Sequence, residues 1–307
     1  MALPGRIDLN ALVVFDAVAE TGGFTAAANR LGIATARVSV DIVRLEAALG
    51  VTLFSRTTRR VALTDAGQAL YEECRPLLQG LDGALAQAGA ERGELAGSLR
   101  ISTTVDHASL TLAPALAEFA RRHPRLTIDL RTSDRVVDMI EQGLDLAIRL
   151  GWLKDSSLRA IKLGEFQQMV VASPAYLRRA GRPNGPHALA QTEWIALGLL
   201  PTPLTWRFSG PDGQAETVQV KAHMRVDSPS ALRALLQAGA GVSVLDQYNA
   251  GVGIADGSLV RLLPEWSLPP AGIYAVLPPG RQLPAKLRAF IDFYQDYLNG
   301  LAAASGA

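Results

Sequence analysis

The sequence predicts an α/β protein in three parts: a small helical module with a β-hairpin, a long helix, and a larger domain of alternating strands and helices. Apolar residues recur at helical spacing up to about residue 89, and a Gly-containing segment follows at 89–97. Beyond it, short apolar runs alternate with helical patterns, as in α/β folds. The 307 residues also exceed one typical domain, which favours this division.

Two short amphipathic helices are predicted near the N-terminus. The first has Phe24, Ala27, Ala28 and Leu31 on one face and ends at Gly32. The second begins near Thr35, whose hydroxyl can cap it, and ends at Gly50. Its buried side is predicted to hold Val38, Ile42, Leu45 and Leu49.

An arginine-rich hairpin is predicted to follow the helix pair. Leu53 and Phe54 lead into SRTTRR at 55–60 and a strand at 61–63. From Arg30 to Asp65 there are six arginines and three acidic residues. Each feature alone is common, because such helix pairs occur in many proteins and charged runs are usually solvated loops. In this order they are typical of a winged helix-turn-helix that binds DNA.

The face of the second helix opposite the apolar stripe is predicted to enter the major groove. It holds Arg37, Val40, Asp41 and Arg44, and the arginines can read guanine edges or hold phosphates. The residues predicted to contact DNA are Thr35, Ala36, Arg37, Ser39, Val40, Asp41, Arg44, Arg56, Arg59 and Arg60. We expect Arg37→Ala to broaden base preference, and Arg59→Ala to weaken binding to all sequences alike.

These residues carry a resemblance to a known family. FTAAANRLG, the pair Val38-Ser39 and RLEAALGVTLFSRTTRRVALTDAG resemble the LysR-type transcriptional regulators. DRVVDMIEQGLDLAIRLGWLKDSSL at 134–158 and VVASPAYLRRAGRP at 170–183 are similar to the effector domain of its CrgA-like branch. The resemblance implies a two-subdomain, periplasmic-binding-protein-like effector domain. It also implies a homodimer or homotetramer that binds double-stranded promoter DNA and responds to a small-molecule effector.

The sequence departs from the family pattern at Val40-Asp41, where basic or amide side chains commonly follow the VS pair. An acid that faces DNA is unfavourable unless it is compensated. Asp41 has the spacing to pair with Arg37 or Arg44, or it can accept a hydrogen bond from cytosine. The alternative is that it points away from the groove, and both interpretations stay open.

A long helix is predicted from Ala66 to Gly89, on the order of 36 Å in length. Its apolar stripe, at heptad spacing, consists of Leu70, Cys74, Leu77, Leu81, Ala84 and Ala88. Such a stripe predicts pairing with a second copy, and an intramolecular core helix is the alternative. Pro76 and Gly80 mark a weak point. The single cysteine, Cys74, excludes an intramolecular disulfide, and packing in this stripe is favoured over a redox role.

The α/β domain is predicted to contain two subdomains. Strands are expected at 99–102, 126–130, 144–150, 165–172, 194–197, 206–208, 218–223, 242–245 and 273–276, and helices at 110–122, 135–142, 174–180, 229–238 and 284–298. The predicted boundaries are 1–65 for the DNA-binding module, 66–95 for the linker and 96–307 for the effector domain. One subdomain combines 98–163 with 271–307, and the other spans 166–268.

A ligand cleft is predicted between the subdomains, where loops at strand ends converge. These loops supply Thr103, Thr104, Ser133, Arg149, Leu197, Gly198 and Asp246. Helices that begin after Thr104 and Ser133 favour an anionic group, so a carboxylate effector is expected. The same hydroxyls are also ordinary helix caps, and Asp246 would prefer an amine, which leaves the effector open.

Other classes of protein fit poorly. The four histidines, at 107, 123, 187 and 223, lack metal-ligand spacing, and Asp106-His107 cannot form a catalytic triad without distant partners. We expect no catalytic residues, no metal and no cofactor. Neither a signal peptide nor a membrane-length apolar run is visible, so a transport receptor is disfavoured and a cytoplasmic protein is expected. The net charge of +1 decides nothing.

Overall fold

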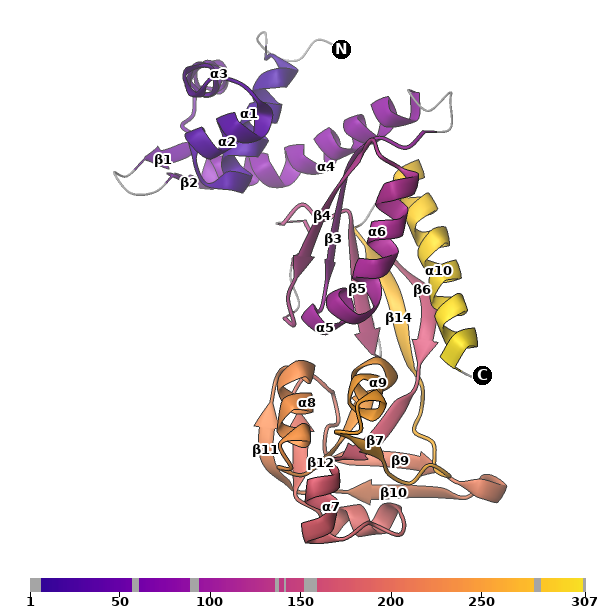
Figure 1. The fold of residues 1–307 in the computed structure, drawn as a ribbon. Coiled ribbons are helices and arrows are strands. Elements are labelled where there is room, and N and C mark those ends of the chain that lie inside the picture. The colour runs from indigo at the N-terminus through magenta and orange to yellow at the C-terminus, as the bar shows by residue number, and fades with distance from the viewer. Residues whose placement is uncertain are drawn as a thin grey trace. The chain divides into compact units, whose positions relative to one another are not determined.

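The computed structural model describes residues 7–56, 61–88, 94–135, 138–140, 142–151, 159–278 and 283–305. The chain divides into two compact units. The first contains residues 1–97 with 138–144, and the second contains 98–137 with 145–307. Figure 1 shows the elements of both units along the chain.

The N-terminal unit is a winged helix-turn-helix followed by a long helix. Its elements are α1 (Leu9–Thr21), α2 (Phe24–Leu31), α3 (Thr35–Leu49), β1 (Phe54–Arg56), β2 (Val61–Leu63) and α4 (Asp65–Ala88). Asp8 caps α1 by accepting a hydrogen bond from the Asn10 backbone N–H at 2.9 Å. Gly32 and Gly50 end α2 and α3 at φ of 65° and 70°, the left-handed conformation that glycine adopts without strain.

The core of this unit is the apolar face predicted from the sequence, with two differences. Phe15, Val38 and Ile42 are fully buried at its centre. Leu49 is 36% exposed, because the last turn of α3 extends past the core. The predicted hydroxyl cap of α3 is also wrong: Ala34 occupies the cap position, and no side chain caps the helix.

Helix α4 begins in tight contact with the hairpin. The Thr64 hydroxyl accepts a hydrogen bond from the Gly67 N–H at 3.0 Å and donates one to the Thr52 carbonyl at 2.7 Å. A Cβ atom at Gly67 would lie 2.1 Å from the Leu53 carbonyl oxygen, so only glycine permits this close approach. The start of the long helix is therefore fixed to the DNA-binding module.

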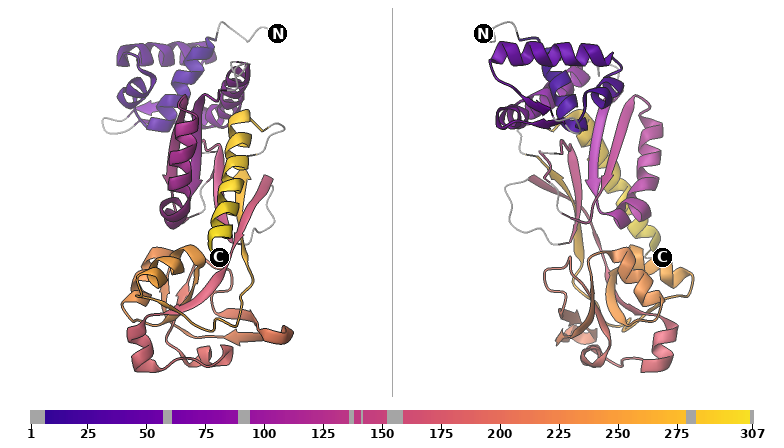
Figure 2. Two further views of the ribbon diagram at one scale, coloured as in Figure 1. Left: turned by 45° about the vertical axis from the view of Figure 1, so that its right-hand side comes forward. Right: turned by 90° about the vertical axis from the view of Figure 1, so that its left-hand side faces the viewer.

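The second unit, which we call the regulatory unit, begins with a sheet of strand order β4-β3-β5-β14-β6. The strands are β3 (Gly97–Thr103), β4 (Leu126–Thr132), β5 (Leu146–Gly151), β6 (Arg159–Phe166) and β14 (Ala271–Leu277). Its helical segments are α5 (Val105–His107), a π-helical turn at Ala108–Leu112, α6 (Ala113–Arg122) and α10 (Ala285–Ser305). Helices α6 and α10 lie side by side in Figure 2. Phe119 of α6 packs on Phe290 and Phe293 of α10.

The second sheet of the regulatory unit has the order β11-β8-β12-β7-β13. Its strands are β7 (Gln168–Ala172), β8 (Trp194–Leu197), β11 (Ala222–Val226), β12 (Val242–Asp246) and β13 (Val260–Arg261). Helices α8 (Pro229–Gln237) and α9 (Gln247–Ala255) cover one face, and α7 (Pro174–Ala180) and the hairpin of β9 (Thr205–Ser209) and β10 (Ala215–Gln219) cover the other. Val171 points to the face covered by α8 and α9, whereas Val170 and Ala172 point to the face covered by α7 and the hairpin, as the alternation of side chains along a strand requires.

The chain crosses between the two sheets at two adjacent places. Gln167 alone separates β6 from β7, and the return runs from β13 to β14 through Pro269. The Gln168 side chain donates a hydrogen bond to the Pro269 carbonyl at 2.9 Å, which joins the two crossings. Gln167 is also held by Gln247: its N–H donates to the Gln247 side chain at 2.8 Å and its carbonyl accepts from the Gln247 N–H at 2.9 Å.

Several predicted elements of the regulatory unit need correction. The described residues of 135–142 form turns in place of a helix, because Ser133 and Asp138 accept backbone hydrogen bonds from Arg135 and Ile140. The predicted strand 165–172 is divided between β6 and β7, and 218–223 between β10 and β11. Helix α9 and strand β13 were not predicted. In the described part of the chain, no helix is long and apolar enough to cross a membrane.

Candidate functional site

The outer face of α3 is open to solvent. Thr35, Ala36, Arg37 and Arg44 are exposed, and Ser39 is half-buried. Val40 is 43% exposed and Val43 is 54% exposed, so the open surface of α3 also carries apolar side chains. This face combines charge with apolar surface, as a helix that enters a major groove requires.

Asp41 is the exception on this face, because its carboxylate is buried. Its Oδ2 accepts a hydrogen bond from Arg37 Nε at 2.8 Å, and Asp41 is only 6% exposed. The Arg37 side chain stays 59% exposed, and the hydrogen bond to Asp41 raises the pKa of its guanidinium. Of the alternatives left open by the sequence, the structure has the pairing with Arg37. Asp41 therefore orients the Arg37 guanidinium from its buried position in α3.

The wing is fixed to α3 by Glu46. Its carboxylate accepts hydrogen bonds from the backbone N–H groups of Leu53 at 2.8 Å and Phe54 at 3.3 Å. The direction in which β1 leaves the helix is therefore set by a residue of α3. The side chain of Arg56 and residues Arg59 and Arg60 lie outside the described residues, so their predicted contact with DNA stays a prediction.

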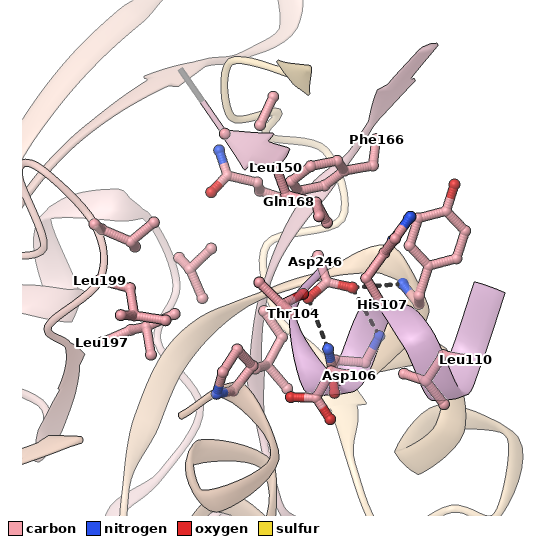
Figure 3. Close-up of a pocket in the computed structure, with 18 of the residues that line it drawn as sticks. Thr104, Asp106, His107, Leu110, Leu150, Phe166, Gln168, Leu197, Leu199 and Asp246 are labelled. Carbon is pink, nitrogen blue, oxygen red and sulfur yellow. Dashed lines mark hydrogen bonds between the residues drawn. The ribbon is translucent and has the colours of Figure 1, made fainter. Parts of the chain in front are cut away.

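A pocket of about 130 Å³ lies between the two sheets of the regulatory unit. Figure 3 shows Leu197 and Leu199 on one side of it and His107 and Leu110 on the opposite side. Its walls are mainly apolar and include Leu110, Leu150, Phe166, Leu197, Leu199 and Val244. The polar residues that line it include Thr104, Asp106, His107, Thr111, Gln168 and Asp246.

The residues predicted for the cleft are only partly brought together. Thr104, Leu197 and Asp246 line the pocket. Thr103 is fully buried, Ser133 lies in a turn, and Gly198 donates its N–H to the Val226 carbonyl at 2.7 Å. Arg149 is half-buried on β5, where burial lowers its pKa. None of these four lines the pocket.

Asp106 and His107 contribute to the pocket although the sequence did not predict them there. His107 Nε2 lies 2.8 Å from the Tyr294 hydroxyl, and burial lowers the pKa of His107 to about 4, so the ring is neutral. Burial raises the pKa of Asp106, against the lowering effect of Arg233 and of a hydrogen bond from the Ser230 backbone. Two titratable residues directly after a strand end are the signal that could have identified them.

The start of α9 at the pocket is capped by Asp246. Its Oδ1 accepts hydrogen bonds from the N–H groups of Tyr248 and Asn249 at 3.0 and 2.9 Å, and its Oδ2 accepts one from the Asn249 side chain at 2.9 Å. Within the described ranges, no group of three or more His, Cys, Asp or Glu side chains has the arrangement of a metal site.

Two family models match the chain. The bacterial regulatory helix-turn-helix protein model of the lysR family covers residues 9–68, and the LysR substrate binding domain model covers residues 92–299. The chain belongs to the LysR family. It is therefore a DNA-binding transcriptional regulator with an effector-binding domain and not an enzyme, as the sequence predicted.

Similar proteins support the same assignment for this LysR-type regulator. The transcriptional regulator PtxR of Pseudomonas aeruginosa is 43% identical over 295 residues, which are 95% of this chain and 94% of PtxR. The structure of CrgA from Neisseria meningitidis has a TM-score of 0.59 at 31% identity and covers 95% of this chain and 99% of CrgA. The full-length structure of AphB, a virulence activator of Vibrio cholerae, has a TM-score of 0.56 at 28% identity and covers 94% of this chain and 99% of AphB. The predicted fold class and the predicted CrgA-like resemblance are confirmed.

Proposed function

We propose that this LysR-type regulator reads its promoter DNA with the outer face of α3 and adjusts that binding to a small molecule in the cleft. The domain division at 66 and 96 is part of this proposal. The observation that carries it is the Arg37–Asp41 pair, because a buried carboxylate holds an exposed guanidinium on the open face of the helix. A regulator of this kind acts on chromosomal DNA in the cytoplasm.

We propose that α3 recognises bases in two ways, by hydrogen bonds from an arginine and by apolar contact from a valine. A guanidinium can donate two hydrogen bonds to the O6 and N7 atoms of guanine, and Asp41 occupies only the Nε of Arg37. The two terminal nitrogens of Arg37 therefore remain for DNA. Val40 offers an apolar surface that suits the methyl group of thymine. Arg44, Thr35, Ala36, Ser39 and the wing arginines at 56, 59 and 60 are proposed to hold the surrounding backbone.

Helix α4 is proposed to pair with its copy in a homodimer, which can assemble further into a tetramer. Leu77, Leu81 and Leu85 on this helix are 71%, 44% and 64% exposed. Several exposed leucines on one helix indicate an interaction surface, whereas a single exposed leucine does not. Cys74 is half-buried and burial raises the pKa of its thiol, which disfavours the reactive thiolate and supports a packing role. Light scattering of the full chain and of Leu77→Glu tests this pairing, and a monomeric wild type would refute it.

Coupling between the cleft and DNA is proposed to run through the oligomer. Closure of the cleft would change the angle between subunits and so the spacing of the paired DNA-binding modules. Small-angle scattering and DNA bending, each measured with and without an effector at saturation, test this mechanism. Unchanged values of both would exclude it.

Fluorescence anisotropy with the chain's own upstream DNA tests the proposed function. We expect tighter binding to that DNA than to random sequence, and a steep loss of affinity as salt rises, because contacts with phosphates release counterions. Equal affinity for both DNAs would contradict sequence-specific reading. Affinity that did not change between two salt concentrations would contradict DNA binding by this basic module.

A further inference from the structure

We propose that the cleft takes an uncharged, ring-sized molecule with a hydrogen-bond donor such as a hydroxyl group, and that it rejects carboxylates. This inference rests on the proposed function, in which the cleft holds the effector. It reverses the expectation from the sequence, which favoured a carboxylate at the helix N-termini.

The main reason is that the protein's own side chains already occupy the anion-binding positions. At the start of α9, Asp246 accepts two backbone N–H bonds and one side-chain bond from Asn249. At the start of α5, Asp134 accepts the N–H of Val105 at 3.2 Å. Three backbone N–H groups that could attract an effector carboxylate are therefore already bonded to Asp246 and Asp134.

The start of α8 is occupied in the same way. The Ser228 hydroxyl accepts the N–H of Ala231 at 3.4 Å, and the backbone of Ser230 hydrogen-bonds to Asp106. A ligand carboxylate in the pocket would therefore face the carboxylates of Asp106 and Asp246. Like charges in the same poorly solvated site disfavour binding strongly.

Among the described residues that line the pocket, no cation offsets these acids. Arg233 lies near Asp106 and lowers its pKa, but one of its nitrogens donates to the Asn249 side chain at 2.6 Å and it does not line the pocket. Arg149 is also outside the lining residues. His107 is buried and neutral, so it supplies no positive charge at physiological pH.

Three buried polar atoms beside the pocket have no hydrogen-bond partner among the described residues. They are Asp106 Oδ2, His107 Nδ1 and Thr111 Oγ1, on residues that are 7%, 3% and 1% exposed. Buried polar atoms are nearly always paired in folded proteins, so these atoms indicate a polar partner that the protein itself does not supply. Carboxylate and hydroxyl oxygens accept hydrogen bonds, and a ligand hydroxyl can donate to them.

The size and lining of the pocket set the rest of the ligand. A volume of about 130 Å³ is close to the roughly 150 Å³ of an engineered apolar cavity that binds benzene. Leu110, Phe166 and Leu197 form apolar walls of the kind that exclude charged groups. One six-membered ring with a short polar substituent therefore fits.

Titration calorimetry of the full chain with four single-ring probes tests the proposal. The probes are benzyl alcohol, toluene, benzylamine and benzoate. We expect benzyl alcohol to bind at least about tenfold more tightly than benzoate and more tightly than the other two. Tighter binding of benzoate or benzylamine would overturn the uncharged class, and binding of toluene as tight as that of benzyl alcohol would overturn the donor requirement. No binding of benzyl alcohol at about 10 mM would overturn the proposal as a whole.

Three variants locate the binding and separate it from the regulatory function. Leu197→Trp should fill the pocket and abolish binding of benzyl alcohol. Val252→Trp, on an exposed position of α9 outside the pocket, is the matched control and should bind as the wild type does. Asp106→Asn should narrow the preference for benzyl alcohol over benzoate. If the probes bind as expected but DNA affinity never responds to them, the ligand class holds and the proposed coupling fails.

Discussion

The DNA-binding helix and the regulatory cleft both contain carboxylates that the protein binds to itself, with opposite results. In α3, buried Asp41 accepts a hydrogen bond from Arg37 and leaves that cation exposed to solvent. In the regulatory unit, Asp246 and Asp134 accept hydrogen bonds from backbone N–H groups at the starts of α9 and α5 that could otherwise bind an anionic ligand. One carboxylate makes its site attractive to an anion, and the others make theirs unattractive. The charge of a residue therefore predicts little until its partners are known.

The largest expected effect is a loss of stability in the N-terminal unit that leaves the regulatory unit unchanged. Gly67→Val would force the α4 backbone away from the Leu53 carbonyl, so we expect it to destabilise the N-terminal unit by about 3 kcal/mol. Hydrogen exchange should then accelerate in α1 to α3 and stay unchanged in the regulatory unit. Gly80→Ala is the control, because a Cβ there meets no atom within 4 Å. Alanine should stabilise that helix, and equal damage by both variants would contradict the close contact.

The second prediction tests the exposed cation. Arg37→Ala should lower affinity for the operator by about 2 kcal/mol and relax preference at one base pair. Affinity for random DNA should fall much less, since phosphate contacts are sequence-independent. Anisotropy with single-base operator variants measures both quantities. Equal loss on operator and random DNA would show that Arg37 contacts only the backbone.

The third prediction concerns the pH dependence of stability that buried His107 in the regulatory cleft should cause. Unfolded His107 takes up a proton near its ordinary pKa of 6.5, whereas the folded residue resists it down to about pH 4. The contribution of His107 to the free energy of unfolding is therefore fully favourable above about pH 6.5, and it is lost as the pH drops toward 4. Between pH 7 and pH 5 the loss should be about 2 kcal/mol.

Urea unfolding at the two pH values measures this loss. His107→Gln removes the titrating group and should flatten the dependence by the same amount, whatever its effect on stability at pH 7. A slope that is identical in wild type and His107→Gln would mean that His107 is not protonated on unfolding.

The smallest expected effect sharpens the role of Asp41. Asp41→Asn keeps the shape of the side chain but removes the charge that holds Arg37, so operator affinity should fall by about 1 kcal/mol. If Asp41 instead faced the DNA phosphates, the same change would strengthen binding. The sign of the change in the anisotropy titration therefore decides between the two positions of this carboxylate.

Local patterns predicted the N-terminal unit well. The spans of α2 and α3 follow from helical periodicity and from the glycines at their ends, and the start of α4 follows from periodicity. Asp41 was left open, because the spacing of four residues to Arg37 and three to Arg44 permits either pair. Only the rotamers in the folded helix select Arg37.

The regulatory cleft was harder to predict, because it is assembled from segments that lie far apart in the chain. Helix α9 has the sequence QYNAGVGIA, whose two glycines and weak periodicity conceal a helix that begins at a half-buried aspartate cap. Thr104, Leu197 and Asp246 were found from strand ends, whereas Phe166 and Gln168 lie where one predicted strand proved to be two. Sequence periodicity cannot show where a strand passes from one sheet to another.

The two chain crossings beside Gln167 and Pro269 determine how the subdomains can rotate. A hydrogen bond from Gln168 joins them, so a rotation of one crossing breaks that bond unless the other crossing follows. If the two crossings move together as a hinge, the cleft opens along a single angle, and different ligands would select different positions along it. The response to an effector would then be graded by ligand size and not limited to two states.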